Sequence, residues 1–89
     1  MERLFTQNEI SYSKQFSDWY VHLAASFCAK EAFFKALGTG LEGHRWVDVE
    51  LRHLPSGEPF LTYKGKPISG QVSISHTSDT AGAVVLLFE

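Results

Sequence analysis

The chain has 89 residues, 44% hydrophobic and 13% aromatic, which is enough for one small domain over residues 1–89. Its formal net charge of −2 provides no basic surface for nucleic acid and no polybasic segment for a membrane. No apolar run approaches the roughly 18 residues that span a bilayer, and the first residues lack the apolar centre of a signal peptide. We therefore expect a cytoplasmic protein with no nucleic-acid or membrane partner.

Two helices are expected in the first part of the chain. Thr6 and Glu9 form a capping-box pattern with Thr6 as the N-cap. This pattern predicts a short helix from Gln7 to about residues 15–17. A long helix is expected over residues 19–37, because a Ser-Asp pair precedes that segment and a glycine follows it.

Beyond the second helix, apolar residues recur at every second position instead of about every 3.6 residues, which indicates strands. Segments rich in glycine and proline separate the apolar runs and predict turns. The four expected strands occupy residues 47–51, 60–63, 72–77 and 81–88. Two helices followed by four strands predict an α+β domain with two N-terminal helices and an antiparallel sheet.

The single cysteine, Cys28, excludes an internal disulfide and a cysteine-based zinc site. It lies between Phe27 and Ala29 on the expected long helix, an environment typical of a small core side chain. We therefore expect Cys28 to pack in the core rather than to act as a nucleophile.

One carboxylate and two ammonium groups interrupt the otherwise apolar long helix. At 100° per residue, Glu31 projects within a stripe of aromatic and alanine side chains, with Lys30 and Lys35 on either side. Since most of the circumference is apolar, we expect this helix to be buried on nearly all sides. A buried charge costs several kcal/mol unless it is paired or bound to an ion, so the cluster predicts a site for a metal and an anion together.

A structural alternative exists for the same charges. Glu31 and Lys35 are four residues apart in the favourable orientation. Such pairs on solvated helices stabilise the helix by a few tenths of a kcal/mol and need no function. On this alternative the chain is a small globular domain with a surface ion pair.

Several segments together match one family pattern. Residues 27–40 read Phe-Cys-Ala-Lys-Glu-Ala-Phe-Phe-Lys-Ala-Leu-Gly-Thr-Gly, and residues 72–77 read Val-Ser-Ile-Ser-His-Thr. Shorter matches are Phe5-Thr6 with Glu9, Trp46 with Asp48-Val49-Glu50, and Gly57-Glu58-Pro59. In this order the segments resemble holo-acyl-carrier-protein synthases, the short-chain type of 4′-phosphopantetheinyl transferases. The resemblance runs from about Phe5 to Val85 and implies the fold of that superfamily.

The resemblance implies an activity and partners. Such enzymes transfer the phosphopantetheine arm of coenzyme A to a serine hydroxyl of an acyl carrier protein and release adenosine 3′,5′-bisphosphate. Coenzyme A is then the substrate, Mg²⁺ the cofactor and the acyl carrier protein the partner. The resemblance also implies a homotrimer with its sites between protomers.

The same resemblance assigns residues by position. Glu31 matches the Mg²⁺ ligand of the family, and Lys35 matches the lysine that meets the phosphates or stabilises the leaving group, so these two are the expected catalytic residues. Carboxylate oxygens are the ligands that Mg²⁺ prefers. The residues expected to contact coenzyme A are Lys30, Lys35, Gly38, Thr39, Gly40, His76 and Thr77.

The chain departs from the family pattern near its start. The family opens with a strand carrying Gly-Thr-Asp or Gly-Leu-Asp, whose aspartate is a second metal ligand, followed by a helix with arginines that dock the carrier protein. Here no aspartate precedes Asp18, the basic residues before the long helix are Arg3 and Lys14, and Ser26 stands where relatives often have arginine. Transfer by these 89 residues alone is therefore expected to be weak or absent.

Three explanations of this departure are open. The chain is a truncated or incorrectly started gene product, or another polypeptide supplies the strand, or the protein kept the fold and lost the reaction. The last explanation defines the alternative function, a non-catalytic module that binds coenzyme A or a carrier protein, or that takes part in assembly.

Overall fold

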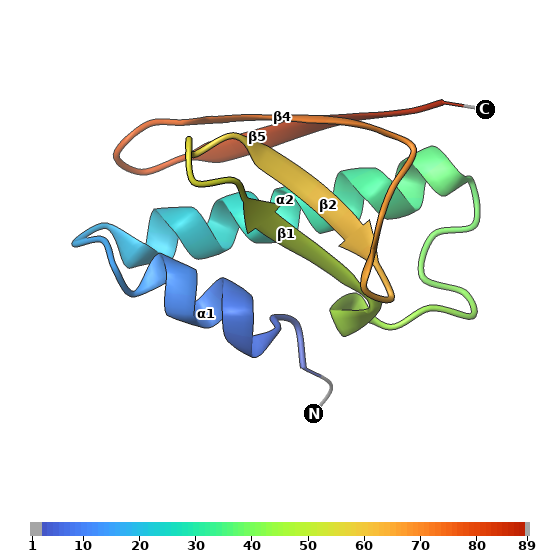
Figure 1. Cartoon of the computed structure of the whole chain (residues 1–89), viewed down its shortest axis with the longest axis horizontal. Helices are drawn as coiled ribbons and strands as arrows, with labels where there is room; N and C mark the ends of the chain where they lie inside the picture. Colours follow the sequence, from blue (N-terminus) through green and yellow to red (C-terminus); the bar gives the residue numbers. More distant parts are fainter. Residues whose placement is uncertain (1–2, 89) are drawn as a thin grey trace.

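The computed structural model describes residues 3–88, in which two helices precede a set of strands (Figure 1). The helices are α1 (Gln7–Ser13) and α2 (Trp19–Leu37), followed by a short 3₁₀ helix (Trp46–Asp48). The strands are β1 (Val49–His53), β2 (Pro59–Tyr63), β3 (Lys66–Pro67), β4 (Gly70–His76) and β5 (Ala81–Leu87). Within residues 3–88, none of the helices combines the length and apolar character needed to cross a bilayer.

Both helices begin and end close to the predicted residues. The Thr6 hydroxyl accepts a hydrogen bond from the Glu9 N–H, and the Glu9 carboxylate accepts one from the Thr6 N–H, so the capping box is confirmed. Gly38 ends α2 in the left-handed conformation, at φ 83°. Asp18 precedes α2 without a side-chain cap, and its carboxylate instead lies 3.3 Å from the His22 imidazole.

The strands form two antiparallel sheets rather than the single sheet that was expected. In the first sheet β2 lies between β1 and β3, and in the second β4 pairs with β5. The first strand begins at Val49 and not at residue 47, because the Asp48 N–H donates to the Arg45 carbonyl at 3.0 Å and closes a 3₁₀ turn, which the Asp48 carboxylate caps by accepting from the Arg45 N–H. The α+β class with two N-terminal helices is confirmed.

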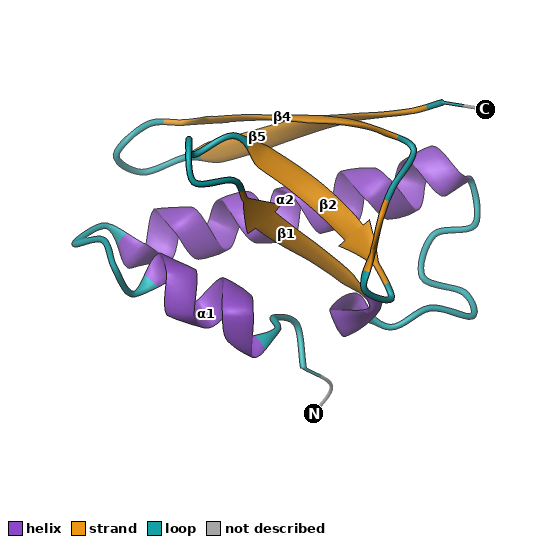
Figure 2. Cartoon of the chain, viewed as in Figure 1, coloured by secondary structure: helices purple, strands orange, loops and turns teal. Residues whose placement is uncertain are grey.

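The strands lie over one side of α2, and α1 lies beside its N-terminal half (Figure 2). The buried residues of α2 are Val21, Ala25, Ser26, Ala29, Lys30, Phe33 and Phe34, which share one broad face. Three of them form the core with residues of β1 and β2, namely Ala29, Phe33 and Phe34 against Val49, Leu51 and Leu61. Half-buried Cys28 reaches the Ala81 carbonyl of β5 at 3.5 Å, consistent with a packing role.

The expectation that α2 is buried on nearly all sides is wrong. Tyr20 is 54% exposed, and Ala24 and Glu31 are also exposed. The apolar residues of this helix are distributed around its whole circumference, so its sequence pattern does not distinguish the face that meets the strands from the face that meets solvent.

A buried ion pair joins α1 to α2. The Lys30 ammonium lies 2.6 Å from Glu9 Oε1, and both side chains are 0% exposed. Lys30 also donates to the Leu4 carbonyl at 2.7 Å, and the second oxygen of Glu9 accepts from the Leu51 N–H of β1 at 2.8 Å. The pair therefore connects the N-terminal segment, both helices and the first sheet.

Burial lowers the pKa of Lys30, and the carboxylates of Glu9 and Glu50 oppose that shift by favouring the charged ammonium. Removing charges from water is costly, so the pair is favourable only because hydrogen bonds engage both groups. Loss of one partner would leave the other charge buried without compensation.

We expect Lys30→Met to lower the free energy of unfolding by about 3 to 5 kcal/mol, because it leaves the Glu9 carboxylate buried without a cation. Glu9→Gln should cost a similar amount, and the double variant less than the sum of the two. Urea denaturation measures all three.

Glu31 and Lys35 provide the matched control, since the same charges lie on the exposed face of α2. Lys35→Met should change stability by no more than about 1 kcal/mol. Equal losses for Lys30→Met and Lys35→Met would contradict a special role for the buried pair.

Candidate functional site

Glu31 and Lys35 lie together on the solvent-facing side of α2. Their side chains are 51% and 77% exposed, and Lys35 Nζ lies 4.0 Å from Glu31 Oε1. An exposed pair at that distance contributes little to stability, so neither group is held in place by the other. The expectation that Glu31 lies on a buried face is wrong for the single chain. Both charges are instead open to a ligand or to another molecule.

Lys30 is not part of this surface. It precedes Glu31 by one residue, and the 100° rotation turns its side chain toward α1 and the core. Its ammonium already contacts Glu9 and the Leu4 carbonyl. The expectation that Lys30 contacts coenzyme A is therefore corrected, because the buried ammonium is directed away from any ligand near Glu31.

The glycine segment predicted to approach a nucleotide begins at Gly38, three residues after Lys35. Gly38 and Gly40 both have positive φ, at 83° and 59°. Thr39 lies between them with its hydroxyl 3.4 Å from the His44 ring. This segment and Lys35 therefore lie at the same end of α2.

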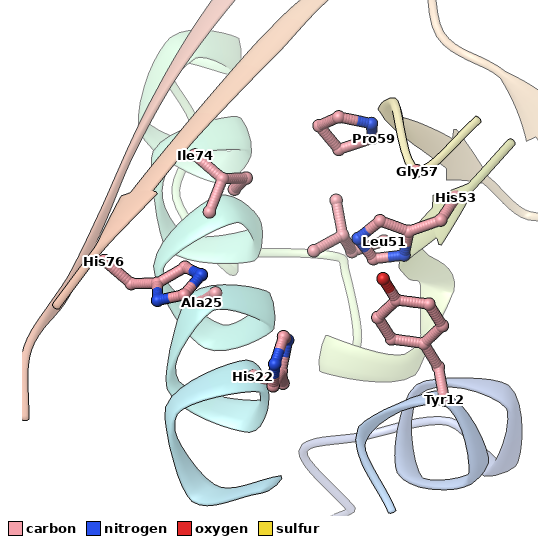
Figure 3. A pocket seen from close by; sticks show the side chains of 9 residues that line it. All are labelled: Tyr12, His22, Ala25, Leu51, His53, Gly57, Pro59, Ile74 and His76. Atoms are coloured by element: carbon pink, nitrogen blue, oxygen red, sulfur yellow. The ribbon is translucent and has the colours of Figure 1, made fainter. Parts of the chain in front are cut away.

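His76 lies near the N-terminal half of α2, away from the glycine segment, in a pocket lined by three histidines (Figure 3). His22 of α2, His53 of β1 and His76 of β4 direct their rings toward a cavity of about 220 Å³. The rings of His22 and His76 are 5.5 Å apart. Tyr12 of α1 stacks on His53 with ring centroids 3.9 Å apart and planes 5° apart.

Thr77, which follows His76, has its hydroxyl engaged in the turn to β5. The hydroxyl donates to Asp79 at 3.0 Å and lies 2.7 Å from the Thr80 hydroxyl. The Thr77 N–H donates to the Thr80 carbonyl at 2.8 Å. This turn fixes the end of the strand that carries His76.

The two groups of predicted site residues do not meet within one chain. The His76 ring faces His22, and Glu31 is nine residues further along α2, or about 13 Å along the helix axis. Within residues 3–88 no three His, Cys, Asp or Glu side chains form a cation site. Glu31 with Lys35 and the glycine segment form one half of the candidate site, and His76 belongs to the other.

Several residues around the predicted site residues were not identified from the sequence. His22 and His53 carried no motif, and the pocket arises because three separate elements converge there. Glu9 was recognised as part of a capping box, but its pairing with Lys30 depends on how α1 packs on α2.

The histidine pocket should make stability depend on pH. Burial lowers the pKa of His53, and the nearby His22 lowers it further. The unfolded chain takes up a proton at about pH 6.5, so the stability that His53 contributes is present above that pH and is lost as the pH falls toward the lowered value.

We expect His53→Phe, which can still stack on Tyr12, to lose less stability than the unmodified chain between about pH 7.5 and about pH 5.5. Urea denaturation at both pH values measures the difference, and His53→Gln serves as a second variant without an ionisable ring. Identical losses in all three proteins would contradict this interpretation of His53.

Comparison with known proteins places this chain in a family. Residues 1–86 match the profile of the 4′-phosphopantetheinyl transferase superfamily. The holo-[acyl-carrier-protein] synthase of Caldanaerobacter subterraneus subsp. tengcongensis is 39% identical over 95 residues, which cover 97% of this chain and 75% of that protein. The corresponding synthase of Syntrophotalea carbinolica is 43% identical over 96 residues, covering 97% and 75%.

A solved structure shows the same fold. The holo-(acyl-carrier-protein) synthase of Bacillus anthracis, in complex with CoA (3′,5′-ADP), superposes with a TM-score of 0.78 at 36% identity, covering 96% of this chain and 76% of that one. The chain thus spans about three-quarters of the length of these relatives. It belongs to the holo-acyl-carrier-protein synthase family of the 4′-phosphopantetheinyl transferase superfamily.

Proposed function

We propose that this protein transfers the 4′-phosphopantetheine arm of coenzyme A to a serine of an acyl carrier protein with the help of Mg²⁺. In this reaction the serine oxygen bonds to phosphorus, a pyrophosphate P–O bond breaks, and adenosine 3′,5′-bisphosphate leaves. The observation that carries the proposal is the open Glu31 and Lys35 pair beside the glycine segment, in a chain that belongs to this family.

Lys35 is suited to the charge that develops on the phosphates. Its side chain is 77% exposed and its ammonium only loosely paired, so the ammonium can turn toward a pyrophosphate without breaking a strong contact. It lies within the last turn of α2, which is followed by Gly38, Thr39 and Gly40. Backbone that follows a glycine cap can approach a ligand closely, because no side chain stands in the way.

Glu31 fits a magnesium ligand by the chemistry of its donor. Mg²⁺ binds through one or two carboxylates together with substrate phosphates and retains several waters. Glu31 offers one carboxylate that faces solvent. The bound ion would neutralise charge on the pyrophosphate oxygens. Lys35, on the next turn of the same face, would add a positive charge to the same phosphates.

We infer that one complete site needs two copies of the chain, in a homotrimer. Within one chain the His76 ring lies beside His22, which precedes Glu31 by nine residues on α2. A second copy can bring its own His76 to the Glu31 of the first. The histidine pocket is then the coenzyme A end of a site whose phosphate end lies on the neighbouring protomer.

Exposed apolar side chains support assembly. Those of β5 alternate along the strand and share one face: Val84 (60% exposed), Leu86 (57%) and Phe88 (55%), the last just beyond the strand. Trp19 and Tyr20 add exposed aromatic surface at the start of α2. An apolar face of this kind on a small domain is typical of a surface that another subunit covers.

Glu31→Gln tests the magnesium ligand. We expect the unmodified chain to bind coenzyme A more tightly with Mg²⁺ than without it, and the variant to lose that difference, because the amide is a poor ligand for Mg²⁺. Isothermal titration calorimetry with and without Mg²⁺ measures both. If the unmodified chain binds equally well in the two conditions, the metal has no place at this site.

Lys35→Ala tests the phosphate contact. In a form of the chain that is active, we expect transfer to fall by about 100-fold, since the ammonium is proposed to meet charge that develops in the reaction. The thermal midpoint should change little, as should both properties in Lys66→Ala, a control at an exposed lysine of β3. A loss of thermal midpoint in proportion to the loss of transfer would assign Lys35 a structural role.

Mass spectrometry of an apo acyl carrier protein incubated with coenzyme A and Mg²⁺ tests the activity itself. We expect little added phosphopantetheine mass with the 89 residues alone, because one carboxylate holds Mg²⁺ weakly. Extending the N-terminus with a strand that carries Gly-Thr-Asp and a basic helix should raise transfer. Within residues 3–88, β5 pairs with β4 alone, so its other edge is a place where a strand could pair.

Rapid transfer by the unextended chain would show that the family's N-terminal aspartate is dispensable. Absence of transfer after extension, with coenzyme A still bound, would favour the non-catalytic binding module.

A further inference from the structure

The segment 38–43, between α2 and the 3₁₀ helix, consists of turns and contains no helix or strand. Its three glycines have positive φ: Gly38 (83°), Gly40 (59°) and Gly43 (78°). A long hydrogen bond of 3.4 Å runs from the Glu42 N–H to the Thr39 carbonyl, and a shorter one of 2.9 Å runs from the His44 N–H to the Leu41 carbonyl. A segment so rich in glycine loses much conformational entropy when it is fixed.

His44 connects this segment to the core. Its Nδ1 lies 2.6 Å from the Tyr63 hydroxyl, and its Nε2 lies 3.4 Å from the Thr39 hydroxyl. The ring lies 5.5 Å, between centroids, from both Phe34 and Tyr63. Among the side-chain hydrogen bonds of residues 3–88, the bond between His44 and Thr39 is the one that reaches segment 38–43.

The partners of His44 make this contact independent of its tautomer. A hydroxyl can donate or accept a hydrogen bond, and each nitrogen of His44 faces a hydroxyl. Either neutral tautomer therefore satisfies both contacts. Tyr63 is held in turn by the buried Phe33, with ring centroids 5.8 Å apart, so the anchor begins in the packed core.

We propose that His44 is a positioning residue that holds segment 38–43 in the conformation presented to coenzyme A. The consequence for binding rests on the proposed function, in which this segment approaches the nucleotide. With the anchor in place, the segment is ordered before the ligand arrives, so binding does not have to order it. Without the anchor, the same contacts form at a greater entropic cost.

The anchor is tested first without any ligand, by amide hydrogen exchange. In His44→Ala we expect exchange in segment 38–43 to be roughly three- to tenfold faster, the loss that corresponds to one hydrogen-bonded contact. Exchange in β1 and β2 should be unchanged. Tyr63→Phe, which removes one hydroxyl, should show part of the same effect. Ser11→Ala is the control, because it removes an exposed hydroxyl of α1 whose hydrogen-bond partner, Gln7, is also exposed.

Calorimetric titration with coenzyme A then tests the consequence. We expect the dissociation constant of His44→Ala to rise by roughly three- to tenfold, and that of Ser11→Ala to stay the same. Unchanged exchange in segment 38–43, or unchanged affinity in His44→Ala, would overturn the role of His44. If the unmodified chain fails to bind coenzyme A, the proposed function fails, and the exchange experiment still decides whether His44 is the anchor.

Discussion

The arrangement of the chain depends on one buried ion pair, between Glu9 of α1 and Lys30 of α2. Each group makes further hydrogen bonds, to the Leu4 carbonyl and to the Leu51 N–H, so the pair is satisfied without water. It fixes the rotation of α2 as well as its position, because a lysine that must reach Glu9 cannot face solvent. The next residue, Glu31, is then turned about 100° away, onto the open face.

That rotation explains why one short motif serves two purposes. In the sequence Lys30-Glu31 the first charge stabilises the fold from inside, and the second is left free at the surface. A free carboxylate beside the loosely paired Lys35 can bind an ion or a phosphate without losing a structural partner. We therefore expect substitutions at Lys30 to act through stability and substitutions at Glu31 to act through binding.

The sequence predicted most of the local structure because those signals are local. The capping box of Thr6 and Glu9, the glycine at the end of α2 and the alternation in β4 each depend on neighbouring residues alone. The buried face of α2 could not be predicted, since apolar residues lie all around the helix and the choice depends on where the sheets pack. The same limit hid the pairing of Glu9 with Lys30.

The candidate site was predictable only in part for a related reason. Glu31 and Lys35 were identified from their charges on an apolar helix and from the family resemblance, and His76 from the resemblance alone. Neither signal gives their relative placement. Their separation within one chain follows from the direction of the His76 ring and the length of α2. The roles of His53 and His44 depend on contacts between distant segments, with Tyr12 and Tyr63 respectively, and no motif marks those contacts.

The central claim is that Glu31 of one protomer and His76 of another act in the same site. Subunit mixing tests it most directly, with Glu31→Gln and His76→Ala prepared separately in a form of the chain that is active. Each variant alone should be inactive in transfer, while dissociated and reassembled mixtures should recover a measurable fraction of the unmodified activity, because some interfaces then contain an intact Glu31 and an intact His76. Mixtures that stay as inactive as the separate variants, although mixed oligomers form, would contradict a site shared between protomers.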